Sequence, residues 1–184
     1  MKTPFNEAKA TQAAAVMLGL RGGQMSYMKL IKLLYLADRT ALLRWGRSIT
    51  TDSYFSMDRG PVLSRVLDLA TDGEDQGAPS IWASHIGEPS HYEVTLTRDP
   101  GRDELSDAEM HVLKDVFEKH GSLGRWELVE LTHKLPEWKH PHGSAIPISV
   151  RDILKAGGKS DLEIAAIEDE IDGVAIAESI LGAA

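Results

Sequence analysis

The stretch KLIKLLYLADR, residues 29–39, decides the fold of this chain. It lies within a helix predicted from Tyr27 to about Arg44, for which Ser26 is a suitable N-cap. The apolar residues of this helix fall on two sides, with Leu30, Leu33, Leu34, Ala37 and Ala41 on one and Ile31, Tyr35 and Leu42 on the other. A helix that is apolar around most of its girth must be covered on those sides, so we expect it to be the central core helix.

Three cations, Lys29, Lys32 and Arg39, share the narrow strip that the apolar residues leave on this helix. A solvated strip is the simplest interpretation, and contacts with phosphates or with an acidic partner are alternatives. Residues 1–65 hold ten Lys or Arg and four Asp or Glu, while residues 66–184 hold ten and twenty-four. Because the net charge of −8 opposes general nucleic-acid binding, a DNA-binding regulator that uses the cations from Lys29 to Arg47 is a third hypothesis rather than the leading one.

The segments on either side of the central helix predict further helices and a small sheet. An Ala-rich helix is expected over residues 6–20, with Asn6 as its cap. The β-branched and aromatic residues from Ile49 to Met57 predict a short strand, and Gly60-Pro61 predicts the start of a helix that reaches about Ala70. After a loop over 71–80, alternation over 81–86 and 91–97 predicts a β-hairpin whose inward residues are Tyr92, Val94 and Leu96.

The second half of the chain predicts three more helices. Capping boxes at Ser106 and Ser160 open two of them, and a third runs from about Gly124 to Lys134. The last helix is acidic and amphipathic over 160–184, with a stripe of Ile164, Ile167, Ile171 and Val174. We therefore expect one domain over 1–184, mainly α within the α+β class: a compact helical domain around a central buried helix, with a small antiparallel β-sheet or hairpin.

The composition excludes several classes of function. The chain has no cysteine, which rules out thiolate catalysis and Cys-ligated zinc and is typical of a reducing compartment. The first residues lack the apolar core of a signal peptide, and no apolar run approaches membrane-spanning length. We expect a cytoplasmic protein without a membrane partner.

The stretch ELTHKLPEWKHPHG, residues 130–143, concentrates the residues that could carry chemistry. Its three histidines, His133, His140 and His142, could be zinc ligands, and a His-centred metal-dependent hydrolase is an alternative function. Prolines interrupt their spacing and the HExxH pattern is absent, so we predict no metal site, no cofactor and no catalytic residue. Trp138 is either a core plug or an interface anchor, whereas Trp45, Trp82 and Trp126 are core candidates.

A resemblance to a known family joins these pieces. KLIKLLYLADR (29–39), GRSITTDSYFSMDRGPV (46–62), LSDAEMHVLKDVFEKHG (105–121) and LVELTHKLPEWKHP (128–141) occur in this order and resemble the Panacea domain, also described as SocA-like or phage-associated GepA-like. The resemblance covers residues 8–156. The motifs match the family at Lys29, Lys32, Leu33 and Tyr35, at Tyr54, Gly60, Pro61 and Val62, and at Thr132, His133, Pro136 and Trp138.

The resemblance implies a mainly helical antitoxin that is not an enzyme and that acts on a cognate toxin protein by direct binding. It also implies an alternative, in which a SocA-like chain serves as a proteolytic adaptor that delivers the toxin to an ATP-dependent protease. Eleven residues are the candidates for partner binding or motif roles: Lys29, Lys32, Tyr35, Arg39, Tyr54, Gly60, Pro61, Thr132, His133, Pro136 and Trp138.

Overall fold

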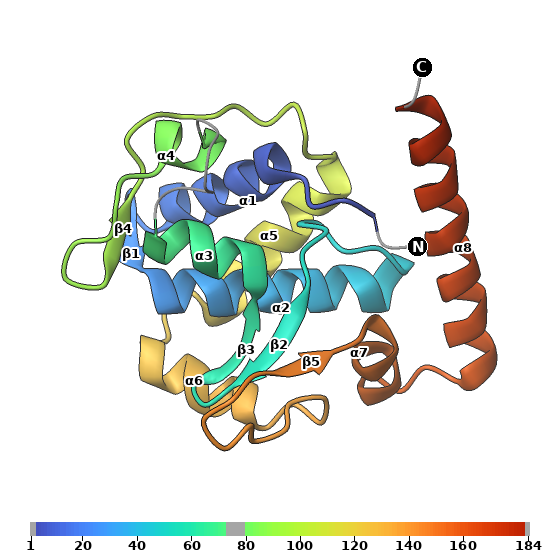
Figure 1. The fold of residues 1–184 in the computed structure, drawn as a ribbon. Coiled ribbons are helices and arrows are strands. Elements are labelled where there is room, and N and C mark those ends of the chain that lie inside the picture. Colours follow the sequence, from blue (N-terminus) through green and yellow to red (C-terminus); the bar gives the residue numbers. More distant parts are fainter. Residues whose placement is uncertain (1–2, 73–79, 183–184) are drawn as a thin grey trace.

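The computed structural model describes residues 3–72 and 80–182, and it confirms a compact α+β fold (Figure 1). Most of the loop predicted over 71–80 lies outside the described residues. The helices are α1 (Glu7–Leu20), α2 (Tyr27–Trp45), α3 (Ser64–Asp72), α4 (Ile81–His85), α5 (Asp107–His120), α6 (Arg125–His133), α7 (Val150–Ala156) and α8 (Asp161–Leu181). The strands are β1 (Gln24–Ser26), β2 (Tyr54–Met57), β3 (Gly60–Leu63), β4 (Glu93–Thr95) and β5 (Ile146–Ile148).

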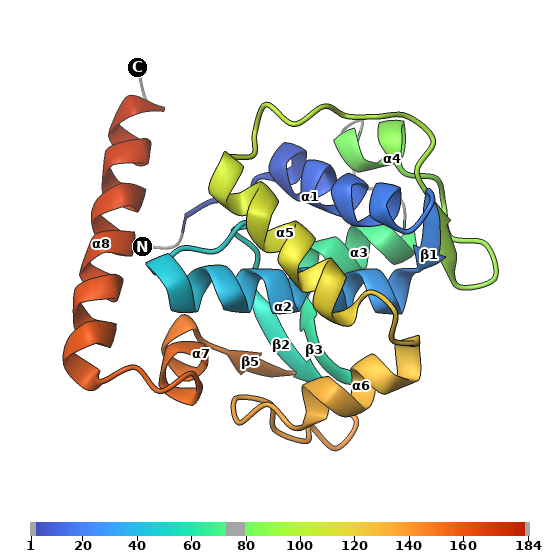
Figure 2. The same ribbon diagram turned by 180° about the vertical axis from the view of Figure 1, so that it is seen from behind.

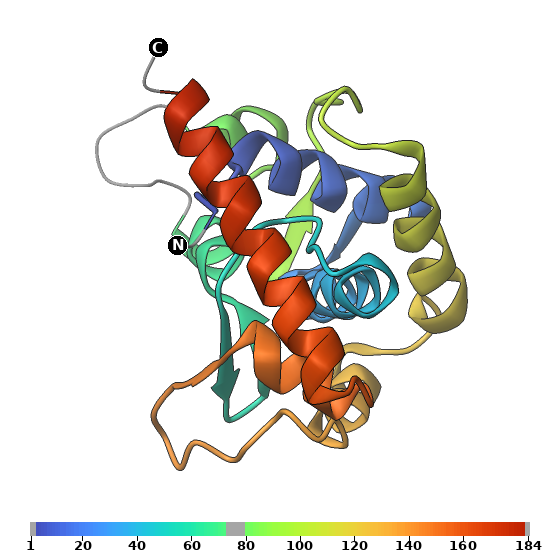
Figure 3. The ribbon, with the colours of Figure 1, turned by 90° about the vertical axis from the view of Figure 1, so that its right-hand side faces the viewer.

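Helix α2 is the centre of the fold, as its apolar girth predicted. Leu33 and Tyr35, on its two predicted apolar sides, are both inaccessible to solvent. Helices α1 and α5 cover one side of α2 (Figure 2), and the sheet, α6 and α7 cover the other, so α2 is surrounded when it is viewed nearly end-on (Figure 3). The central core helix is therefore confirmed.

The segment after β2 forms a strand where the sequence predicted a helix. Gly60-Pro61 opens β3, which pairs antiparallel with β2 across the two-residue turn Asp58-Arg59, and β5 pairs with the other edge of β2. Helix α3 begins only at Ser64, because the Asp52 carboxylate accepts hydrogen bonds from backbone amides of its first turn. Of the strand predicted over residues 49–57, only Tyr54–Met57 form a strand, β2.

The predicted hairpin is wrong for most of its first strand, although its two segments do pair antiparallel at one bridge, Ile86 with Leu96. Residues Ile81–His85 form helix α4, which the Glu7 carboxylate supports by accepting a hydrogen bond from the Trp82 amide. Strand β4 forms its ladder with β1, where Met25 lies opposite Val94. Tyr92 is 64% exposed rather than inward, because its backbone turns through a φ of 65° just before β4.

Helix α8 lies beside the body of the protein rather than inside it (Figures 1 and 3). Of the predicted apolar stripe, Ile164 is fully buried, whereas Ile167, Ile171 and Val174 are only half-buried. Ile167 packs on Gly46, directly after the C-terminal end of α2. A cleft of about 1250 Å³ separates much of α8 from the body, so the docking of the stripe is partial.

Candidate protein-interaction site

The family motifs, far apart in the sequence, meet around the β2–β3 hairpin. The Lys32 side chain leaves α2 and is 1% exposed, and its Nζ donates a hydrogen bond of 2.7 Å to the carbonyl oxygen of Pro61. Burial lowers the Lys32 pKa from 10.5 to about 7. Lys32 thus ties the hairpin to the central helix from inside the protein.

Gly60 is required where the hairpin crosses α6. Its φ is +96°, and a Cβ at this position would lie 2.8 Å from Thr132 Oγ1 and 3.1 Å from Lys32 Nζ. The Thr132 hydroxyl donates a hydrogen bond of 2.8 Å back to the Leu128 carbonyl in α6, which fixes its oxygen beside the hairpin backbone. The three motif residues therefore share one contact with no room for a further methyl group.

Glu137 is the buried carboxylate that joins the loop after α6 to α2. It is 4% exposed and accepts hydrogen bonds from Tyr35 Oη (3.0 Å) and from Arg39 Nε (2.6 Å). Burial, followed by the Glu137 charge, raises the Tyr35 pKa above its ordinary value. The sequence patterns did not single out Glu137, because its partners lie about a hundred residues away.

Tyr54 extends this polar network on the opposite side of Tyr35. The two tyrosine rings meet edge to face at 5.6 Å, and Tyr54 Oη donates a hydrogen bond of 2.9 Å to Asp38 Oδ2. Asp38 is fully buried and also accepts from the amides of Ile49 and Thr50. Burial raises the Asp38 pKa to about 6 even though these hydrogen bonds act to lower it.

Trp138 is half-buried and fixes the loop to the hairpin. Its Nε1 donates a hydrogen bond of 3.0 Å to the Met57 carbonyl, and its ring stacks on His133 at 4.0 Å. Burial lowers the His133 pKa, and a backbone hydrogen bond with Asp58 opposes this shift. The His140 ring contacts Trp138 on an edge, at 5.8 Å, so Trp138 makes ring contacts with both of these histidines.

The structure gives no support to the metal-centre hypothesis. Among residues 3–72 and 80–182, it assembles no group of three or more His, Asp or Glu side chains that could hold a metal ion. Pro136, the remaining motif residue of this loop, is exposed.

The prediction of a solvated cation strip on α2 is wrong. Lys29 is 7% exposed and donates a hydrogen bond of 2.6 Å to the Gly121 carbonyl, and burial lowers its pKa. Lys32 is buried and bound to Pro61, and Arg39, whose side chain is 18% exposed, is paired with Glu137. Their acceptors lie in other elements, which is why the helical pattern alone could not predict their burial. Lys29 and Lys32 are therefore unavailable to the phosphates of DNA.

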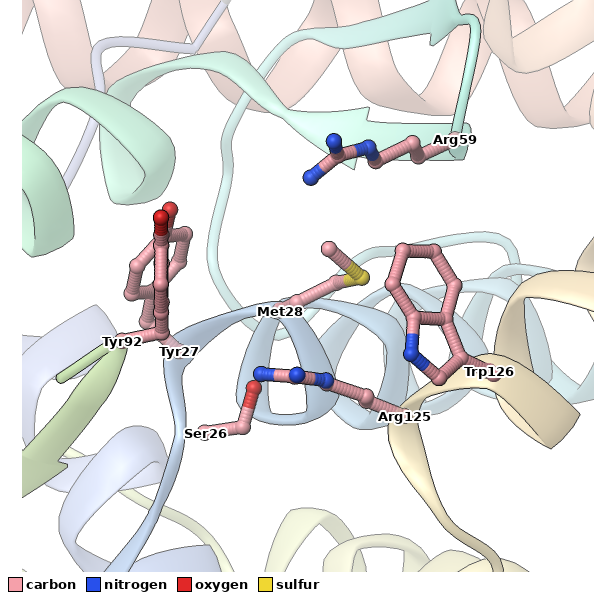
Figure 4. Close-up of a pocket in the computed structure, with 7 residues that line it drawn as sticks. All are labelled: Ser26, Tyr27, Met28, Arg59, Tyr92, Arg125 and Trp126. Carbon is pink, nitrogen blue, oxygen red and sulfur yellow. The ribbon is translucent and has the colours of Figure 1, made fainter.

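A small open pocket lies next to this motif core, at the N-terminal end of α2 (Figure 4). It has a volume of about 200 Å³. Elements held by the motif contacts supply its walls: the β2–β3 turn contributes Arg59, and α6 contributes Arg125 and Trp126. The start of α2 and the turn before β4 complete the lining with Ser26, Tyr27, Met28 and Tyr92.

The pocket combines aromatic surface with positive charge. Trp126 is 52% exposed, which corrects its prediction as a core residue, and both guanidiniums lie 5.5 Å from its ring centre. Arg125 also lies 5.9 Å from the ring centre of Tyr92. In the described part of the chain, neither Arg59 nor Arg125 forms an ion pair. Such side chains offer donors, charge and apolar area for binding a partner.

The sequence did not predict this pocket, although it contained weak signals. Arg59 occupies a tight turn, where an exposed side chain is expected, and Trp126 directly follows Arg125 at a helix start. Four separate segments contribute to the lining, so only the tertiary structure brings them together.

Comparison with known proteins returned one family. The family described as antitoxin SocA-like, Panacea domain, matches residues 30–139, more than half of the chain. No curated protein and no solved structure matched. Across the described ranges, the structure contains no helix with the length and apolarity to span a lipid bilayer.

Proposed function

The chain belongs to the antitoxin SocA-like, Panacea domain family, and on this premise we propose that it is an antitoxin that neutralises a protein toxin by binding it directly. The observation that carries the proposal is the match to an antitoxin family across α2, the β2–β3 hairpin and α6. These elements surround both the motif core and the pocket.

The exposed side chains of the pocket support a binding role. Tryptophan, tyrosine and arginine dominate the residues that carry binding energy in protein interfaces. Trp126 and Tyr92 leave large ring areas in water, and Arg59 and Arg125 are free to pair with a partner. An interface that covers them would bury apolar area and engage both charges.

The arrangement of the motif core supports a binding module rather than an enzyme. Most of its polar groups are hydrogen-bonded within it, Lys32 to Pro61, Tyr35 and Arg39 to Glu137, and Trp138 to Met57, whereas His133 Nε2 is buried without a partner. Groups engaged in this way fix the positions of the hairpin and α6. The role we propose for the motif residues is to hold the binding surface in shape.

The proposal is tested by expressing the chain together with the small protein encoded beside its gene. We expect that small protein to stop growth when it is expressed alone, growth to recover when this chain is co-expressed, and the two proteins to elute together in size-exclusion chromatography. Growth recovery in cells that lack their ATP-dependent proteases would separate neutralisation by binding from delivery to a protease. Failure of the two purified proteins to form a complex would contradict the proposal.

A further inference from the structure

The N-terminal end of α2 opens into the pocket without a side-chain cap. Ser26 is the N-cap residue, yet its hydroxyl accepts no hydrogen bond from the first turn of α2. The Ser26 Oγ atom is buried and has no hydrogen-bond partner. A buried hydroxyl without a partner costs free energy, and Ser26 lines the pocket, so a small rotation of this side chain would let a group in the pocket satisfy it. The amides of a first helical turn add positive character in the same place.

Two guanidiniums approach this position from opposite sides (Figure 4). Arg59 reaches in from the β2–β3 turn and Arg125 from the start of α6, with the Met28 side chain between them. Both lie against Trp126 rather than against a carboxylate. The aromatic face holds each guanidinium in place while leaving its N–H donors available for an anion.

The shape of the pocket indicates what kind of anion it takes. Its walls include Met28 and the rings of Tyr27 and Trp126, and its volume of about 200 Å³ suits one side chain. The ligand therefore needs an apolar stem as well as a charged end. A glutamate side chain has both, and guanidinium groups bind carboxylates through paired hydrogen bonds.

We propose that this pocket receives an acidic side chain, preferably glutamate, from the docking segment of the toxin. The inference rests on the proposed function and names the chemistry of the contact that the toxin makes. The two arginines bind the carboxylate, the Ser26 hydroxyl rotates toward it, and Trp126 and Tyr92 cover its stem. The chain carries a net charge of −8, so a local pair of cations orients an acidic segment that the rest of the surface repels.

The test compares two double variants of the full chain with the same change of charge. Arg59→Gln with Arg125→Gln removes both pocket charges, whereas Arg98→Gln with Arg102→Gln removes two exposed charges from the loop before α5. Circular dichroism and thermal melts establish that both variants are folded. If the pocket variant melts below the wild type, Arg59→Gln alone, at an exposed turn position, provides the same comparison.

We expect the pocket variant to bind the toxin at least about 30-fold more weakly in calorimetry, because each lost charge-assisted contact weakens binding several-fold or more. The loop variant should stay within about threefold of the wild type. A scan of toxin glutamates to glutamine should then find one variant with the same loss, and its effect should not add to that of the pocket variant.

Each other outcome has a distinct meaning. Wild-type affinity in the pocket variant would overturn the inference and leave the antitoxin function intact. Competition by inorganic phosphate below millimolar concentration would also overturn it, because the pocket would then be a phosphate site. The absence of any complex with the wild-type chain would reject the proposed function, and this inference with it.

Discussion

At the scale of single residues, Lys32 shows how a charged side chain can be built into a core. The Pro61 carbonyl compensates part of the loss of water around its ammonium group, but among residues 3–72 and 80–182 no carboxylate forms an ion pair with it. The side chain is therefore stable chiefly as the neutral amine, and its pKa is lowered to about 7. Protonation of Lys32 opposes folding.

The stability of the protein should consequently depend on pH through Lys32. Between pH 7 and the ordinary pKa of 10.5, the unfolded chain binds the Lys32 proton and the folded chain does not, so stability rises with pH over this interval. Relative to Lys32→Met, the wild type should gain about 2 kcal/mol between pH 7 and pH 9 in urea unfolding. Lys155→Met, at an exposed lysine, is the control and should show no such slope. Parallel curves for wild type and Lys32→Met would contradict the argument.

At the scale of elements, the β2–β3 hairpin depends on close contact with its neighbours. Gly60 brings the hairpin backbone against Thr132 of α6 and Lys32 of α2, so three elements meet at one residue without a side chain. The turn beside it presents Arg59 to the pocket. Displacing the hairpin would therefore change the binding surface as well as the core.

Substitution of two glycines, Gly60 in the hairpin and Gly143 in the loop before β5, distinguishes the cost of backbone strain from the cost of steric contact. Gly60 and Gly143 both have positive φ, at 96° and 83°, but a Cβ meets close neighbours only at Gly60. Gly143→Ala should cost about 1 kcal/mol from the backbone alone, and Gly60→Ala at least about 3 kcal/mol, because it adds a clash to the same strain. Denaturant unfolding of the two variants measures the difference. Equal losses would show that the crowding around Gly60 relaxes without cost.

Local sequence patterns predicted the elements whose signals are local. The apolar residues around most of α2 and the capping boxes at Ser106 and Ser160 were sufficient to predict helices α2, α5 and α8. Each of these signals depends on residues within one or two helical turns. Strand β3 was missed, because Gly60-Pro61 suits a helix start and only pairing with β2 makes it a strand. The burial of Lys29 depends on a carbonyl 92 residues away, and the pocket depends on four segments, so neither has a local signal.

At the scale of the whole molecule, α2 runs between two separate regions, the pocket and the docking site of α8. The pocket lies at its N-terminal end, and α8 packs near Gly46 just after its C-terminal end, roughly 28 Å away for a helix of 19 residues. The family match ends at residue 139 and includes neither α7 nor α8. Binding at one end should therefore be independent of the helix at the other.

Removal of residues 161–184 tests this independence. The shortened chain should still unfold in one cooperative transition, with a loss of about 3 kcal/mol, because Ile164 is the one isoleucine of the α8 stripe that is fully buried. Its affinity for the toxin should stay within about twofold of the full chain. Ile164→Ala in the full chain is the matched control and should account for most of the lost stability. Loss of binding on truncation would place α8 in the interface.

The cleft under α8 has a consequence for how the protein moves. Local opening requires only the free energy of the contacts that the opening segment makes, and those of α8 include the buried Ile164 and Ala175, the packing of Ile167 and the exposed Arg151–Glu168 ion pair. Its backbone amides should then exchange with deuterated water through excursions that leave α2 closed. The slowest-exchanging amides of the chain should lie in α2. Helix α8 should therefore open far more often than the core helix.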